Sequence, residues 1–471
     1  MNNSKQAEHP RRGHDLTQGP ILRTLLTFSI PTLVSNVLQT LGGTINTIWV
    51  GQLIGDRALA ATANANMVMF LVFAFVFGFG MAATVKVGQY FGAHDYDAAR
   101  RVFGTGTGFC AAFALIGGFV GFLASDWLLR ALSTPPAIHD MAREYLDVVF
   151  LTMPFGTVSM MVSMSLRGAG DPKTPLYAMI LTTILGIVLN PVLILGLGPA
   201  PQFGIAGSAL ANALASFIGL AAMIGYIYWH DIPIRLKGRE LRYLLPLRSE
   251  LAYVLGKGLP MGGQMAITTV AGVIMFGLVN REGLMAAAAY GALLQIWSYI
   301  QMPAFAISTA VSAMVAQNVG AARHDRVEPI TMAGVYANIL MTGLLASLLL
   351  LFDGPLLSLF LGHGSAAVPI AEHVQIIVTW SYVLIGITMV LTGTMRSYGA
   401  VILPLIVMVV AMYPARLGFY ALTHPYLGSE AVWWAFPAGS VISVVGTWLA
   451  YKSSGWRGQQ IVPPPGALPA E

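Results

Sequence analysis

The sequence predicts an all-α polytopic membrane protein with twelve transmembrane helices, arranged as two pseudo-symmetric six-helix bundles around a central cleft. Three observations lead to this fold class: an apolar composition, twelve long apolar segments and an internal repeat. Of the 471 residues, 56% are hydrophobic and only 10% are charged, whereas soluble domains carry about 25% charged residues. A chain with so few charges cannot cover a water-facing surface, so it requires a bilayer.

Each apolar segment is long enough to cross a bilayer, which needs about 20 mainly apolar residues per helix. The segments lack the period-two alternation of membrane β-barrel strands, so they predict helices. Prolines such as Pro154 and Pro191 fall inside them and predict bends. The twelve segments cover approximately 22–54, 59–91, 103–125, 143–166, 174–198, 204–229, 250–279, 285–318, 330–352, 368–394, 401–423 and 429–451.

The distribution of Lys and Arg predicts the orientation. With a cytoplasmic N-terminus, 19 of these residues lie in cytoplasmic segments, 4 lie in outer loops, and Lys86 and Arg416 lie within helices. This asymmetry satisfies the positive-inside rule and predicts a multi-pass protein of the inner (plasma) membrane with both termini in the cytoplasm. The polar start has no signal-peptide pattern, so the first apolar segment is expected to remain as a spanning helix. The basic central linker is expected beside anionic lipid head groups, and nucleic acid is not an expected partner.

The two halves of the chain repeat each other. Pro260 follows Pro31 by 229 positions, Gln317 follows Gln89 by 228, and Arg396 follows Arg167 by 229. Copies of six helices share one topology, so the repeat predicts an axis along the membrane normal and a cavity at the interface between the copies. The expected divisions are a cytoplasmic tail (1–20), a first bundle (21–230), the linker (231–249), a second bundle (250–451) and a second tail (452–471). Duplicated bundles that rock around one site indicate transport.

Several motifs resemble the MATE (multidrug and toxic compound extrusion) family in their order along roughly 18–455. They include IPTLVSNVLQTLGGTINTIWVGQLIG (30–55), VGQYFGAHDYDAARR (87–101), LRGAGDPKTP (166–175), GLPMGGQMAITT (258–269) and VAQNVGAARHD (315–325). The resemblance implies a secondary active transporter that exports cationic or amphipathic organic compounds in antiport with Na⁺ or H⁺ by alternating access. It also implies small organic substrates, a coupling cation and membrane lipids as partners, and no cofactor.

The chain departs from the family pattern at three positions. Many members carry an acidic residue where this chain has Asn46, another just before the proline that corresponds to Pro191, and a third near Thr268; here the second position is Asn190. An amide can offer a carbonyl oxygen to Na⁺, because hard cations take oxygen ligands, but it cannot carry a proton. The sequence therefore leaves the coupling ion open, with a possible Na⁺ site near Asn46 and Asn190.

Polar residues inside the predicted helices are the candidates for substrate or ion binding. Asn36, Gln39 and Asn46 are spaced so that they share one helical face. Amides in membrane helices also hydrogen-bond to neighbouring helices, and the sequence does not separate this structural role from a cleft-lining one. An ionisable residue near a helix end, such as Asp147, can serve as a cation site or lie at the membrane interface. The full set is Asn36, Gln39, Asn46, Asn190, Gln264, Thr268, Gln295, Asp147 and Arg416.

Other classes of protein fit less well. The sequence contains no zinc-protease, nucleophile-elbow or P-loop motif. We therefore expect no catalytic residues and no enzymatic activity, and we do not expect ATP-driven transport. The alternative to drug export is a flippase or exporter of lipid-linked or polysaccharide substrates, which would hold phosphate groups in a basic cavity. Only Arg416 and Lys86 are predicted to be basic within the membrane, which disfavours this alternative.

Overall fold

The computed structural model describes residues 15–198, 201–362, 365–453 and 455–459, and no strand occurs within these ranges. The helices of the first half are α1 (Ile21–Leu53), α2 (Asp56–Gly92), α3 (Tyr96–Ala131), α4 (Pro136–Gly168), α5 (Lys173–Leu195) and α6 (Gly204–Trp229). Those of the second half are α7 (Arg248–Arg281), α8 (Leu284–Gly320), α9 (Val327–Leu351), α10 (Asp353–Leu361), α11 (Ala367–Val378), α12 (Ser381–Ser397), α13 (Ile402–Val410), α14 (Arg416–Leu427) and α15 (Glu430–Lys452).

The predicted all-α membrane fold is confirmed. In the described part of the chain, 11 helices are long and apolar enough to cross a membrane, and α11 with α12 forms one further span that is bent by 44°. A five-residue π-helical segment (Ala411–Ala415) joins α13 and α14 into one span. The short helix α10 lies between the ninth and tenth predicted segments and was not predicted.

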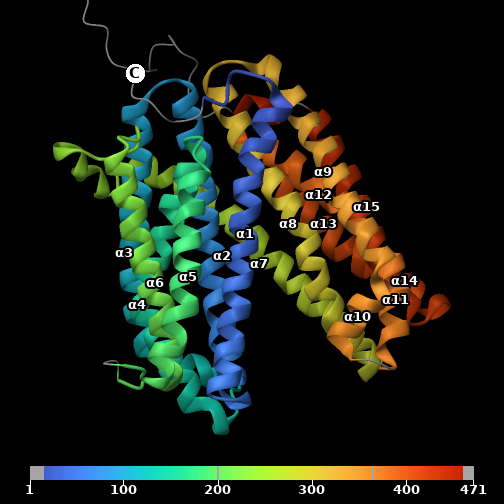
Figure 1. Ribbon diagram of the computed structural model, residues 1–471. Coiled ribbons are helices and arrows are strands. Elements are labelled where there is room, and N and C mark those ends of the chain that lie inside the picture. Colours follow the sequence, from blue (N-terminus) through green and yellow to red (C-terminus); the bar gives the residue numbers. More distant parts are fainter. Residues whose placement is uncertain (1–14, 199–200, 363–364, 454, 460–471) are drawn as a thin grey trace, which may run out of the picture.

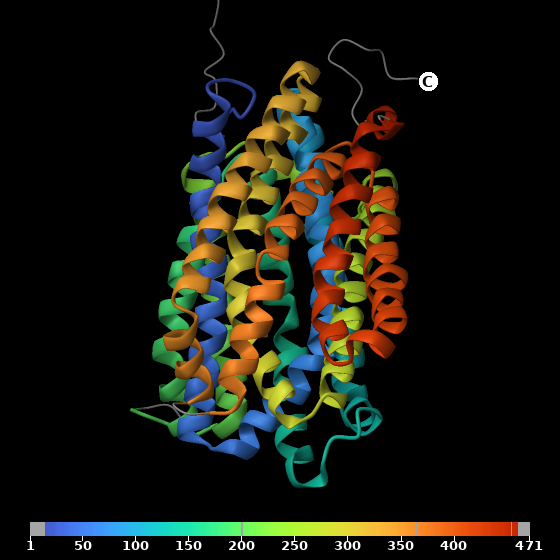
Figure 2. The ribbon, with the colours of Figure 1, turned by 90° about the vertical axis from the view of Figure 1, so that its right-hand side faces the viewer.

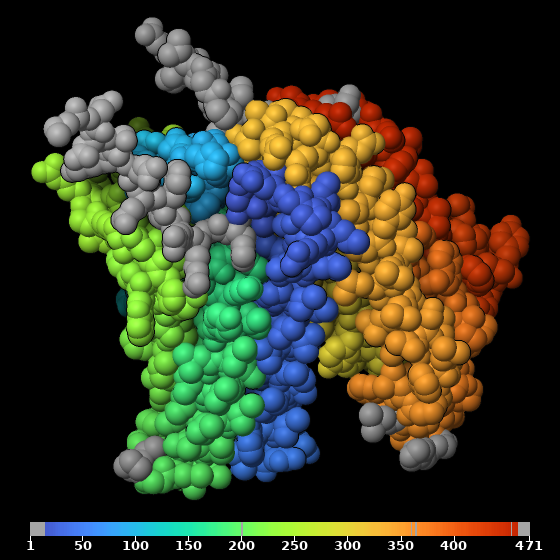
Figure 3. All heavy atoms as spheres, turned by 45° about the horizontal axis from the view of Figure 1, so that its top comes forward, coloured from blue at the N-terminus to red at the C-terminus, as the bar shows by residue number. Residues whose placement is uncertain are grey.

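The helices form two lobes that meet at one end and separate at the other (Figure 1). In the first lobe α4 packs against α2, α3 and α6, and in the second lobe α12 packs against α8, α9 and α15. Contacts of α2 with α7 and α8, and of α1 with α8, hold the lobes together. Turned by 90°, the second lobe shows its helices running side by side along the length of the molecule (Figure 2). The atoms of the two lobes leave a recess between them beyond the junction (Figure 3).

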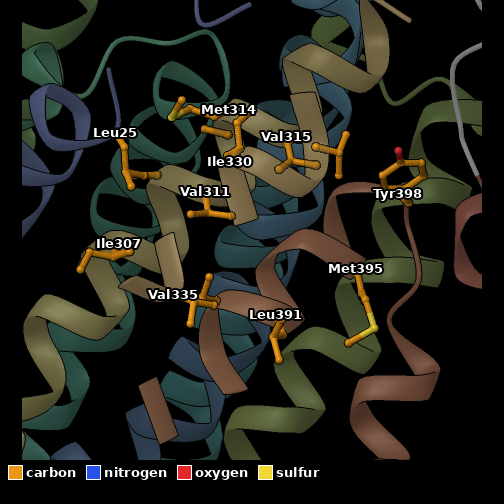
Figure 4. Packing of buried hydrophobic residues seen from close by; sticks show 14 of the residues in the cluster. Leu25, Ile307, Val311, Met314, Val315, Ile330, Val335, Leu391, Met395 and Tyr398 are labelled. Atoms are coloured by element: carbon orange, nitrogen blue, oxygen red, sulfur yellow. The ribbon is translucent and has the colours of Figure 1, made fainter. Parts of the chain in front are cut away.

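The N-terminal part of α1 belongs to the junction between the lobes. Leu25 and Phe28 are buried in an apolar cluster with residues of α8, α9 and α12, which include Ile307 and Val311 (Figure 4). Because α1 continues from this cluster into the first lobe, where it packs against α5, it connects the two lobes.

The central linker folds back onto the first lobe. Its short 3₁₀ helix (Gly238–Leu244) packs against α3. The Tyr243 hydroxyl donates a hydrogen bond to Asp97 Oδ1 at 3.1 Å, and Arg100 Nη1 lies 2.9 Å from Glu240 Oε1. The linker is therefore an ordered part of the molecule; its position beside lipid head groups stays a prediction.

Large apolar side chains cover the outer surface of the spans. On α3, for example, Leu115, Ile116, Phe119 and Leu123 are all exposed. An apolar stripe of this kind would be unfavourable in water, since soluble proteins rarely expose large contiguous apolar patches. In a bilayer the same stripe contacts lipid tails, in agreement with a membrane protein.

Candidate functional site

A cleft of about 1280 Å³ lies between the lobes. Residues from both repeats line it: amides and hydroxyls of α1, α5 and α6, apolar side chains of α2 and α4, and a mixed wall from the second lobe. Among the described residues, its only formally charged lining residues are Arg167, Arg396 and Arg416, and no Asp, Glu or Lys lines it.

Asn46 connects α1 to α6 at the cleft wall. Its Oδ1 accepts hydrogen bonds from Ser208 Oγ at 2.8 Å and from Asn212 Nδ2 at 3.0 Å. Since the oxygen is already engaged twice, the amide nitrogen is the atom that Asn46 offers to the cleft. This geometry is better suited to an acceptor on a ligand than to a cation.

Asn190 and Asn36 also line the cleft, and each leaves one polar atom unpaired. Asn190 is 1% exposed, and its Nδ2 donates to the Gly186 carbonyl at 2.8 Å. Within the described residues, Asn190 Oδ1 and Asn36 Nδ2 are buried without a hydrogen-bond partner. Buried polar atoms are nearly always paired, so these two are candidates to meet water or a ligand. Gln39 lines the cleft from an exposed position on the same face of α1.

In the second lobe, Gln264 and Thr268 lie one helical turn apart on the cleft face of α7. The Thr268 hydroxyl donates to the Gln264 carbonyl at 2.8 Å, and Gln264 Nε2 lies 3.4 Å from the Val401 carbonyl. Gln264 therefore links α7 to the segment that begins the α13–α14 span.

The remaining candidates are located as follows. Arg416 lines the cleft, whereas Gln295 and Asp147 are not among its lining residues. Gln295 is exposed on α8, and Asp147 Oδ2 lies 3.7 Å from Arg143 Nε on the preceding turn of α4. The structure thus brings seven of the nine candidates to one cleft. Their roles in binding stay predictions.

Arg416 begins α14 directly after the π-helical segment that contains Pro414. Such π segments inside α-helices occur frequently at functional sites. The guanidinium carbon lies 4.8 Å from the centroid of the Phe436 ring, and Tyr290 and Tyr382 line the same cleft. Arg416 therefore sits in an aromatic environment at the cleft wall.

Arg167 and Arg396 line the cleft but were not among the predicted site residues. The charge count assigned both to cytoplasmic segments, but they occupy the last turns of α4 and α12 and line the cleft. They are equivalent in the repeat, 229 positions apart. This equivalence could have identified them from the sequence. A basic residue at the same position in both copies can belong to a site that the copies share, and not only to two cytoplasmic loops.

The cleft is closed at the junction by contacts between equivalent residues of the two repeats. Gln89 Nε2 of α2 donates to the Ser397 carbonyl at 2.6 Å, and its counterpart Gln317 Nε2 of α8 donates to the Gly168 carbonyl at 3.1 Å. Ser397 and Gly168 are themselves counterparts, 229 positions apart. Each copy therefore seals against the other through the same pair of groups.

The segment before α1 adds a further contact at the closed end. Leu16 N donates to Gln317 Oε1 at 3.0 Å, and Asn318 Nδ2 donates to the Leu16 carbonyl at 3.1 Å. At the other end of the described chain, Trp456 packs edge-on against Tyr398 with ring centroids 5.0 Å apart. The first and last described segments thus lie at the same, closed end of the molecule.

We expect Asn46→Leu to lower the free energy of unfolding by about 1–3 kcal/mol, because it leaves the buried Ser208 hydroxyl without its acceptor. Asn46→Asp keeps an acceptor oxygen and should unfold close to wild type. Thermal unfolding of the purified variants measures both. If the Leu variant were as stable as the Asp variant, the Asn46 contacts would not stabilise the lobe.

Comparison with known proteins agrees with this architecture. The MatE family matches residues 31–192 and 260–421, two regions that begin 229 positions apart, as the repeat does. A probable multidrug resistance protein of Bacillus subtilis, YoeA, is 31% identical over 94% of this chain and 95% of its own. A FAD transporter of Shewanella oneidensis is 25% identical over 86% of this chain and 90% of its own.

Among solved structures, an outward-facing multidrug resistance MATE family transporter of the MOP superfamily is similar with a TM-score of 0.87 and 21% identity. The similarity covers 96% of this chain and 99% of that chain. These relatives are transporters rather than enzymes. From its two family matches and its relatives, this chain belongs to the MATE family of multidrug efflux transporters, multi-pass membrane proteins that handle small organic substrates.

Proposed function

We propose that this protein is a secondary active efflux transporter that moves amphipathic organic compounds out of the cell by alternating access. The observation that carries the proposal is the large cleft, closed at the junction by paired contacts of the two repeats and lined by both polar and apolar side chains. Binding sites for drug-sized ligands measure roughly 300–1,000 Å³, so a cleft of 1280 Å³ is large enough for such a compound.

We infer an inner-membrane location with both termini in the cytoplasm. The excess of Lys and Arg on one side supports this orientation. The closed end would then be cytoplasmic and the cleft would face outward. Lipids would contact the exposed apolar stripes, such as the one on α3.

The coupling cation is Na⁺ or H⁺ in this proposal. A proton carrier inside the cleft would need a titratable side chain, and the described lining holds no carboxylate. Asn190 Oδ1, which is buried and unpaired within the described residues, is the oxygen best suited to meet a Na⁺ ion. Both observations favour Na⁺.

The test is dye transport in proteoliposomes under a Na⁺ gradient or a pH gradient imposed separately. Ethidium and fluorescein serve as a cationic and an anionic amphipath. We expect transport under the Na⁺ gradient, and Asn190→Leu should weaken it at least tenfold, with Asn64→Leu on α2, outside the cleft lining, as the matched control. Transport under the pH gradient alone would contradict Na⁺ coupling. No transport of either dye under either gradient, with folded protein, would contradict efflux.

A flippase of lipid-linked substrates is the second candidate, favoured by one observation. Three arginines line the cleft, where the sequence predicted at most two basic residues within the membrane. Vesicles that contain a fluorescent polyprenyl phosphate decide between the two functions: translocation of this lipid without transport of either dye would favour the flippase.

A further inference from the structure

We propose that the cleft selects amphipathic organic anions, whose carboxylate, sulfonate or phosphate group binds Arg416 while an aromatic body packs on Tyr290 and Phe436. This inference rests on the proposed efflux function and deepens it by assigning the charge of the substrate. It replaces the cationic class that the family resemblance implied.

The charged side chains in the described lining of the cleft all have the same sign. All three formally charged residues in its described lining are arginines, and no acidic residue lines it to neutralise them. Clefts with walls of low dielectric concentrate the field of the charges that line them and raise the local concentration of ligands with the opposite charge. An organic cation in this cleft would instead meet three like charges.

Arg416 lies in the cleft wall without a charged partner among the described residues. The guanidinium forms neither an ion pair nor a hydrogen bond with any described residue, and its Nε atom is buried and unpaired. A guanidinium has five N–H donors in a planar fork that matches a carboxylate or phosphate group. Arg416 thus presents an unused set of donors at the wall of a cavity that a ligand can enter.

The side chain of Arg416 is also held in place by close packing. Gly439 of α15 lies so near that a Cβ atom at this position would be 3.0 Å from Arg416 Nε and 3.1 Å from the Ala411 carbonyl. The Tyr413 hydroxyl anchors the π-helical segment by donating to the Ile267 carbonyl of α7 at 3.0 Å. A donor held this firmly loses little entropy when it binds, which favours recognition of a ligand.

Aromatic rings line the cleft beside Arg416. The Tyr290 and Phe436 rings lie with centroids 5.8 Å apart, and both line the cleft. Behind them Trp297 is fixed by a hydrogen bond from its Nε1 to Thr379 Oγ1 at 3.2 Å. Aromatic rings in the cleft wall, next to a guanidinium without an ion-pair partner among the described residues, can bind a molecule that is aromatic at one end and anionic at the other.

The driving force is consistent with this charge. In a cell whose interior is electrically negative, the membrane potential expels anions and retains cations. An organic anion therefore moves outward down the potential, so its export needs less coupling than export of a cation. A cleft without carboxylates is adequate for such a substrate.

Binding to the purified full-length protein tests the inference independently of transport. Fluorescein and rhodamine 123 share a xanthene ring system but carry opposite charges, and fluorescence polarisation measures the affinity of each. We expect fluorescein to bind the wild type more tightly than rhodamine 123. Arg416→Gln should weaken fluorescein binding at least tenfold, Arg416→Lys should weaken it less, and neither variant should weaken rhodamine 123 binding.

The matched control is Arg130→Gln, which removes the same charge from an exposed position outside the cleft lining. It should leave both affinities unchanged. Tighter binding of rhodamine 123 to the wild type, or undiminished fluorescein binding by folded Arg416→Gln protein, would overturn the inference. Selective fluorescein binding without transport of any dye would uphold the anion site and contradict the efflux function. If a polyprenyl phosphate displaced fluorescein more strongly than a soluble aryl phosphate did, the anions that bind this site would be lipid-linked.

Discussion

Replacement of Gly92 by alanine is expected to slow transport at least tenfold and to open the closed end of the cleft. Gly92 of α2 packs so closely on α8 that a Cβ atom there would lie 1.8 Å from the Gln317 carbonyl oxygen. The counterpart Gly320 has the reciprocal contact, 1.8 Å from the Gln89 carbonyl oxygen. Neither obstacle is a flexible side chain, so either substitution must push the two helices apart.

Either substitution should destabilise the closed conformation substantially, because forcing extra atoms into a packed contact typically destabilises a protein by about 1–3 kcal/mol. The residues whose backbone carbonyls would be displaced, Gln317 and Gln89, also donate the cross-lobe hydrogen bonds to the Gly168 and Ser397 carbonyls. The substitutions remove these contacts from the conformation that is closed at this end. They do not affect a conformation in which the lobes are apart at this end, so that conformation becomes more favourable relative to the closed one. Gly92→Ala and Gly320→Ala should therefore shift the population in the same direction.

The measurement combines dye transport with labelling of a cysteine at Thr269, an exposed cleft residue of α7, by a membrane-impermeant maleimide added from the open side. The native Cys110 is buried and should stay unlabelled. Both glycine variants should show less labelling and at least tenfold slower transport. Gly256→Ala, where a Cβ atom meets nothing within 4 Å, is the control and should behave as wild type. Unchanged labelling and transport in Gly92→Ala would mean that this crossing does not hold the cleft closed.

Much of this fold could be predicted because hydrophobic length and repetition are local or periodic properties of the sequence. The eighth predicted segment, 285–318, differs from α8 (Leu284–Gly320) by only one and two residues at its ends. The bend between α11 and α12 and the π-helical segment before Arg416 were not predicted in detail. Both depend on how neighbouring helices pack, which hydropathy does not record.

The cleft was predicted less completely, for a physical reason. Gln295 and Gln301 lie on different faces of α8, so only one of them, Gln301, reaches the cleft. No periodic pattern within α8 identifies which face meets the partner lobe, since both faces of a buried transporter helix can be apolar. Arg167 and Arg396 were assigned to loops because a charge count treats each basic residue at a helix end as solvated, whereas these two point into a cavity.

Lys86 is a further residue whose surroundings the sequence did not predict. The sequence placed Lys86 within a helix and gave it no partner, but Lys86 Nζ lies 2.7 Å from Glu250 Oε2 of α7, and the two side chains are only 8% and 10% exposed. The ammonium also lies 4.6 Å from the centroid of the Tyr253 ring. This pair connects the two halves of the chain, and its partners are too far apart in sequence for any local pattern to reveal.

Lys86→Met is expected to lower the free energy of unfolding by about 3–5 kcal/mol, because it leaves Glu250 as a buried charge without a partner. Glu250→Gln should cost a similar amount by leaving Lys86 unpaired. The double variant Lys86→Met, Glu250→Met should recover most of the loss or exceed the wild type, since apolar residues of similar volume often replace a buried ion pair without penalty. Thermal unfolding in detergent compares the four proteins, with Arg130→Gln as the exposed-charge control. If the double variant were less stable than either single one, each side chain would stabilise the protein even without its partner, and the attraction between Lys86 and Glu250 would not be the main contribution of the pair.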